Sequence, residues 1–82
     1  VMIVDDSAVI RGLMTRWLEA DPAITVAGTA HNGPSALKTL ATVQPDVVIL
    51  DIEMPEMDGM TALPKIIAAM PGVKIIMAST LT

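Results

Sequence analysis

Short apolar runs alternate along the chain with stretches in which apolar residues recur every three or four positions. The runs occupy residues 1–4, 24–30, 47–50 and 73–78, lengths that suit strands. Each of the three intervening stretches carries a single apolar stripe, the pattern of an amphipathic helix. Strands alternating with helices indicate βαβ units with right-handed crossovers. We therefore predict an α/β fold whose parallel sheet is covered by helices on both faces.

The apolar runs also differ in strength, and this difference predicts the order of the strands. Val47–Leu50 is wholly apolar and mostly β-branched, which predicts a central strand buried on both faces. Ile24–Ala30 is weaker and is expected nearer an edge. A flavodoxin-like sheet of order 2-1-3-4 meets both expectations. The length of 82 residues leaves room for one domain, residues 1–82.

Local signals predict details of the three helices. Asp6 or Ser7 is expected to cap the first helix, and residues 32–34 open the second. Pro64 is expected in the first turn of the third helix, where a missing N–H removes no helical hydrogen bond. Trp17 is the only aromatic residue and falls on the apolar stripe of the first helix, so we expect it in the core.

Composition excludes several classes of function for this segment. The net charge is −4 and no run of Lys or Arg occurs, which argues against direct nucleic-acid binding. No apolar run approaches the ~18 residues of a membrane span, and no signal peptide is visible. Cysteine is absent, so neither a disulfide framework nor a thiolate site is expected. A cytoplasmic location is the expectation compatible with these features.

Acidic residues follow two of the predicted strands. Asp5 and Asp6 end the first strand, and Asp51 ends the third. In the order 2-1-3-4 these strands are neighbours, and their carboxyl ends meet where ligands bind to such sheets. Three converging carboxylates repel one another, and Mg²⁺ with oxygen ligands relieves that repulsion. The alternative is that Asp6 caps a helix and Asp5 is a solvated strand end.

Together these residues resemble a known family. The segment Val4–Ser7 carries the acidic pair, residues 51–59 read D-x-x-M-P-x-M-D-G, and Ala78–Thr80 ends the fourth strand. All three motifs are similar to those of the receiver domain of two-component response regulators, and the resemblance covers essentially the whole chain.

The resemblance implies a phosphoryl-transfer chemistry. Asp51 would be the phosphoacceptor, taking a phosphoryl group from a phosphohistidine or a small phosphodonor. Ser79 aligns with the switch hydroxyl that turns onto the phosphoryl group, and Thr80 beside it is the alternative. The phosphodonor partner would be a histidine kinase or a phosphotransfer protein.

The resemblance also implies a ligand set for Mg²⁺. Asp6 and Asp51 would bind the cation, and Asp5 would act directly or through water. The backbone carbonyl of Glu53 would complete the protein ligands.

One subgroup of the family is more similar than the rest. Residues 51–55 (D-I-E-M-P), 62–66 (A-L-P-K-I) and 79–82 (S-T-L-T) resemble the receiver of the chemotaxis methylesterase. That protein joins a receiver to a catalytic domain which demethylates or deamidates chemoreceptors. An output domain in the same full-length chain is therefore expected, and no esterase activity is expected of these 82 residues.

The family pattern continues past the fourth strand with a helix, a fifth strand that carries a lysine, and a last helix. The sequence stops at Thr82, so we expect a partial receiver, from strand 1 through strand 4. The outer edge of the run Val73–Ala78 would then be open. We expect the segment to pair with a second copy through that edge, to exchange elements between copies, or to be covered by a longer chain.

Three functions compete at this stage. The first is a phosphoacceptor signalling module, and the second is a pairing module without chemistry. The third is a Mg²⁺-dependent phosphohydrolase, which is disfavoured because such enzymes commonly place a second aspartate where this chain has Glu53. Whether the segment counts as an enzyme stays open, since self-catalysed phosphoryl transfer to Asp51 is its only expected chemistry.

Overall fold

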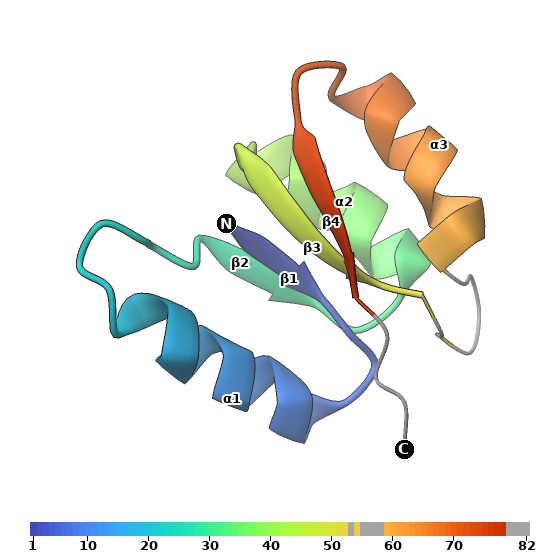
Figure 1. Ribbon diagram of the computed structural model, residues 1–82. Coiled ribbons are helices and arrows are strands. Elements are labelled where there is room, and N and C mark those ends of the chain that lie inside the picture. The colour runs from blue at the N-terminus through green and yellow to red at the C-terminus, as the bar shows by residue number, and fades with distance from the viewer. Residues whose placement is uncertain (53, 55–58, 79–82) are drawn as a thin grey trace.

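The computed structural model describes residues 1–52, 54 and 59–78 and shows strands and helices in strict alternation (Figure 1). The roles predicted for Glu53, Ser79 and Thr80 concern residues outside the described part of the chain. The elements in chain order are β1 (Met2–Val4), α1 (Ala8–Glu19), β2 (Gly28–Ala30), α2 (Gly33–Val43), β3 (Val47–Asp51), α3 (Gly59–Ala69) and β4 (Lys74–Ala78).

All strands are parallel and lie in the order β2-β1-β3-β4, which confirms the predicted sheet. The second strand is shorter than its apolar run, because only Gly28–Ala30 is strand and Ile24–Ala27 is not. In the sheet, Gly28–Ala30 pair in register with Met2–Val4 of β1. On the N-terminal side of these residues, the two segments are joined by single hydrogen bonds, such as that from Ala27 N to the carbonyl of Val1 at 2.8 Å.

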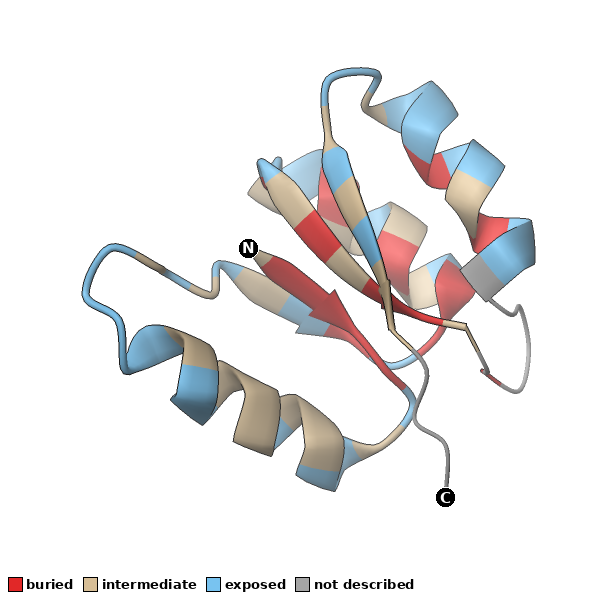
Figure 2. Cartoon of the chain, in the orientation of Figure 1, coloured by how far each residue is buried: buried red, intermediate tan, exposed pale blue. Residues whose placement is uncertain are grey.

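Side chains of the inner strands alternate between two faces of the sheet, and the main core lies on one of them. Met2 and Val4 of β1 and Val48 and Leu50 of β3 are buried on the face that α2 and α3 cover (Figures 1 and 2). The helices contribute to this cluster the buried side chains of Ala36, Leu40, Ala62 and Ile66. Aliphatic packing between these elements therefore fixes how the strand ends lie.

The opposite face is covered by α1, which packs mainly on β1. Ile3 of β1 is fully buried there, but Ile76 of β4 is 55% exposed. No residue of α1 is fully buried, and Trp17 is 70% exposed, so the prediction of a core tryptophan was wrong. Since α1 packs chiefly on one strand, β1, part of the apolar stripe read from the sequence lies outside that contact.

The helix starts follow the cap signals with one exception. Ser7, rather than Asp6, caps α1, and its Oγ accepts a hydrogen bond from Ile10 N at 3.3 Å. Asn32 caps α2, and its Oδ1 accepts from Ser35 N at 2.7 Å. Pro64 lies inside α3 and not in its first turn, because the helix begins as early as Gly59.

Within the described residues, no helix has both the length and the apolar character needed to cross a membrane.

A close approach between β2 and α2 yields a prediction about stability. A Cβ at Gly28 would lie 3.0 Å from Cγ2 of Val43 and 3.4 Å from Cγ2 of Thr39. We expect Gly28→Ala to lower the free energy of unfolding by about 1 kcal/mol through overpacking, measured by urea unfolding. The cost should shrink in a Val43→Ala background, where the clashing methyl is gone.

Gly12→Ala is the matched control, because Gly12 lies on α1 with nothing within 4 Å of its added Cβ. It should stabilise the protein by about 0.5–1 kcal/mol through helix propensity. Equal effects of Gly12→Ala and Gly28→Ala would contradict the packing argument.

Candidate metal centre

The turn after β1 carries two acids in different environments. Asp5 is 3% exposed, and its backbone N–H donates to the carbonyl of Ala30 at 3.0 Å, which extends the contact with β2. Its carboxylate Oδ1 accepts a hydrogen bond from Ser7 N at 2.9 Å. Asp6 is exposed. Asp5 is thus not a solvated strand end and Asp6 is not the helix cap, so the alternative interpretation of the pair was wrong.

The third acid lies at the end of the neighbouring strand. Asp51 is the last residue of β3, where it pairs in register with Ala78 of β4. It is 1% exposed, and its Oδ2 atom is completely buried. The next residue continues the pairing, because Ile52 N donates to the carbonyl of Ala78 at 2.9 Å. Hydrogen bonding on the β4 side therefore fixes the backbone that carries Asp51.

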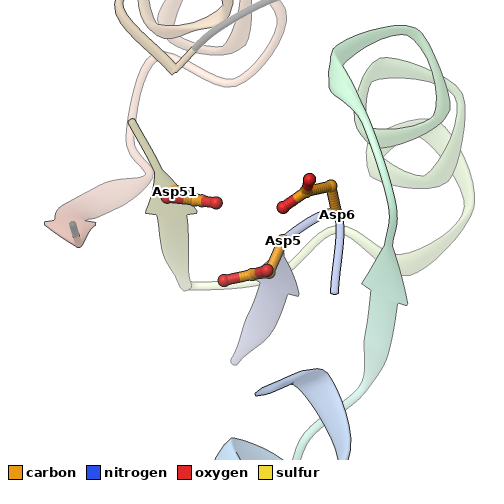
Figure 3. A group of neighbouring side chains, drawn as sticks. All are labelled: Asp5, Asp6 and Asp51. Carbon is orange, nitrogen blue, oxygen red and sulfur yellow. The ribbon is translucent and has the colours of Figure 1, made fainter. Parts of the chain in front are cut away.

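The three carboxylates meet at the carboxyl edge of the sheet. One oxygen from each of Asp5, Asp6 and Asp51 lies within 4.8 Å of the others. Figure 3 shows the side chains of Asp6 and Asp51 pointing toward one another, with Asp5 close to both. The cause is the parallel register of β1 and β3, in which Val4 pairs with Leu50, so the residues that follow lie side by side.

This donor set fits a hard divalent cation. Mg²⁺ binds oxygen ligands at about 2.0–2.1 Å in an octahedron, which spaces neighbouring ligand oxygens by roughly 3 Å and opposite ones by roughly 4 Å. The three carboxylate oxygens lie within 4.8 Å of one another, so small side-chain rotations would bring them to those spacings. Two of the three acids are buried, and the cost of burying like charges falls when a cation is shared between them. The residues therefore match the chemistry that Mg²⁺ requires.

Basic residues are distributed unevenly around this edge. Lys74 begins β4 at the opposite edge of the sheet, and Lys38 and Lys65 are exposed on α2 and α3. Among the described residues, no lysine follows the carboxyl end of a strand. The sequence interpretation did, however, miss Arg11, whose Nη1 donates to the backbone carbonyl of Asp5 at 2.6 Å. The signal was available: a helix capped by Ser7 directs its first-turn side chains back toward the preceding turn.

Comparisons with known proteins agree on one family. The chain matches the response regulator receiver domain over residues 1–82. It is 54% identical to a protein-glutamate methylesterase/protein-glutamine glutaminase of Maricaulis maris and 60% identical to one of Rhodospirillum centenum, in each case over all 82 residues. These residues span only 20% and 21% of the two relatives. The chain thus corresponds to about a fifth of the length of the curated relatives it matches.

Solved structures give the same result. The response regulator domain of Thermotoga maritima CheB superposes with a TM-score of 0.90 at 37% identity, covering 99% of this chain and 60% of that one. The CheX–CheY–BeF3–Mg²⁺ complex from Borrelia burgdorferi matches with a TM-score of 0.86 at 34% identity, covering 98% of this chain and 60% of that one.

The acidic cluster predicts specific effects on metal binding. Asp51→Ala and Asp6→Ala should each raise the Kd for Mg²⁺ about tenfold or more, because each removes a charged ligand, and Asp5→Ala should have a smaller effect. Calorimetric titration of the natural full-length chain measures this. Mg²⁺ should also raise the Tm of the wild type through binding to the native state.

Asp46→Ala is the control for charge alone, since Asp46 is exposed just before β3, at the strand end remote from the cluster. It removes the same charge and should leave the Kd nearly unchanged. An Asp51→Ala variant with wild-type Mg²⁺ affinity would rule out a shared site.

Proposed function

Because the chain belongs to the response regulator receiver family, we propose that it is the phosphoacceptor module of a two-component chemotaxis system, phosphorylated on Asp51 with Mg²⁺. The observation that carries the proposal is the buried carboxylate of Asp51, held at the end of an inner strand beside Asp5 and Asp6. The relatives named methylesterase/glutaminase support the chemotaxis assignment. The similarity to a complex that contains BeF3 and Mg²⁺ supports the chemistry.

In the proposed reaction a carboxylate oxygen of Asp51 attacks the phosphorus of the donor. With a phosphohistidine donor, the P–N bond breaks, an acyl phosphate forms on Asp51, and the imidazole leaves with the electron pair. Mg²⁺, when bound, neutralises charge on the phosphoryl oxygens. Asp5 and Asp6 would hold that cation, while the near-complete burial of Asp51 limits the access of water to the nucleophile.

The partners follow from the same proposal. A histidine kinase or a phosphotransfer protein would supply the phosphoryl group, and a cytoplasmic location fits such a donor. Ser79 or Thr80 would supply the switch hydroxyl, and the carbonyl of Glu53 would join the metal ligands. By analogy with its relatives, an output domain outside these 82 residues would carry any methylesterase or glutaminase activity.

The phosphohydrolase alternative has less support. Among the described residues, both acids that accompany Asp51 come from the end of β1, and the sequence has Glu53 where such enzymes commonly have an aspartate. Turnover of a phosphomonoester would distinguish such an enzyme from a phosphoacceptor, which takes up one phosphoryl group and keeps it until hydrolysis.

A pairing role has one observation in its favour. Within the described sheet β4 is an edge strand, and Ile76 on it is 55% exposed. A hollow of about 640 Å³ lies on the same face, with Leu18, Ile24 and Ile49 among its lining residues. Open strand edges and exposed apolar surface both favour association.

Phosphorylation is tested directly with acetyl phosphate and Mg²⁺. The natural full-length chain should gain one phosphoryl group on Asp51, read by intact mass, and Asp51→Asn should gain none because the amide is not a nucleophile. Asp46→Asn, which removes a charge remote from the cluster, should be phosphorylated normally.

The isolated 82-residue segment should react poorly, because no lysine is available to contact the phosphoryl group. Fast, complete phosphorylation of that segment would show that the fifth-strand lysine of the family pattern matters little for the reaction.

Pairing is tested by sedimentation of the isolated 82-residue segment. We expect association at micromolar concentration, and we expect Ile76→Glu to weaken it by placing a charge on the β4 edge. Lys74→Glu changes the charge of the same strand without removing apolar surface and serves as the control. A compact monomer with cooperative unfolding would contradict the pairing role.

A further inference from the structure

Arg11 contacts both ends of the acidic turn that follows β1. Its guanidinium Nη1 donates to the backbone carbonyl of Asp5 at 2.6 Å. Its own backbone N–H donates to the carbonyl of Ser7 at 3.0 Å. One residue therefore bridges the residue before Asp6 and the residue after it.

The remaining hydrogen bonds of the turn show why this bridge matters for Asp6. Asp5 is held twice more, by its N–H on the carbonyl of Ala30 and by its Oδ1 accepting from Ser7 N. Asp6 is exposed, so packing does little to hold its side chain. The direction in which its carboxylate points depends chiefly on the backbone of the turn, and Arg11 is the side chain that fixes this backbone from the helix side.

The guanidinium binds a carbonyl and not a carboxylate. Among the residues that the structure describes, Arg11 forms no ion pair, although three carboxylates lie at the same turn and the neighbouring strand. The oxygens that would bind a cation are therefore not occupied by Arg11. Arginine stays protonated and presents donors in a rigid plane, so it can hold a backbone carbonyl in a defined direction.

We propose that Arg11 is a positioning residue, which sets the Mg²⁺ affinity by holding the turn so that Asp5 and Asp6 face Asp51. This inference rests on the proposed function, since it concerns the same metal centre. Groups that orient metal ligands from behind affect the affinity by about 10–100-fold in other metal sites. If Arg11 acted only through its charge, its removal would have the opposite effect. A cation near the site repels Mg²⁺, so losing that charge alone would strengthen Mg²⁺ binding.

The test is the Kd for Mg²⁺, measured by calorimetry on the natural full-length chain. Arg11→Met should raise the Kd about tenfold, because the bond to the Asp5 carbonyl is lost while the aliphatic stem is kept. Arg16→Met is the matched control: it removes the same charge from an exposed position on the same helix. Its Kd should equal that of the wild type or be slightly lower. An unchanged or lower Kd in Arg11→Met would overturn the proposal.

A second variant covers the case in which Arg11→Met does not fold, judged from its Tm without Mg²⁺. Arg11→Lys keeps the charge and one donor but loses the planar geometry, so its Kd should lie between those of the wild type and Arg11→Met. If only Arg11→Lys folds, a Kd equal to that of the wild type would overturn the proposal. Failure of the wild type to bind Mg²⁺ would instead refute the proposed function, which separates the two inferences.

Discussion

The arrangement of the site depends on the parallel register between β1 and β3. With Val4 opposite Leu50, the acids that follow each strand emerge at one level and on neighbouring strands. Side chains alternate along a strand, so a slip of one residue would turn both Ile49 and Asp51 toward α2 and α3 and would move Val48 and Leu50 to the opposite face. The apolar packing of Met2, Val48 and their neighbours thus excludes the registers in which the carboxylates would not meet.

The fold was predictable because its signals are local and repeated. Four apolar runs separated by helical stripes gave the strand order, and Val47–Leu50 identified the inner strand. The meeting of Asp5, Asp6 and Asp51 followed from that order alone. It needed no knowledge of side-chain contacts.

The structural features that could not be predicted from the sequence depend on the extent of tertiary contact. The stripe containing Trp17 is a property of one helix, but its burial depends on what lies opposite, and α1 packs mainly on β1. The extent of β2 depends on which of its residues pair with β1, and the position of Pro64 within α3 depends on where that helix begins. The first-turn position of Arg11 indicated the direction of its side chain, but its hydrogen bond to the Asp5 carbonyl also depends on a side-chain rotamer, which no periodicity encodes.

The position of β1 inside the sheet has a consequence for synthesis of the chain. Of the described strands, β1 is synthesised before the others, and it lies between β2, which follows soon, and β3, which follows later. Until β3 is synthesised, one hydrogen-bonding edge of β1 stays unpaired. The nascent chain therefore passes through a stage in which β1 can associate with other chains through its unpaired edge. That stage ends when β3 pairs with β1, which also brings Asp51 to the metal centre.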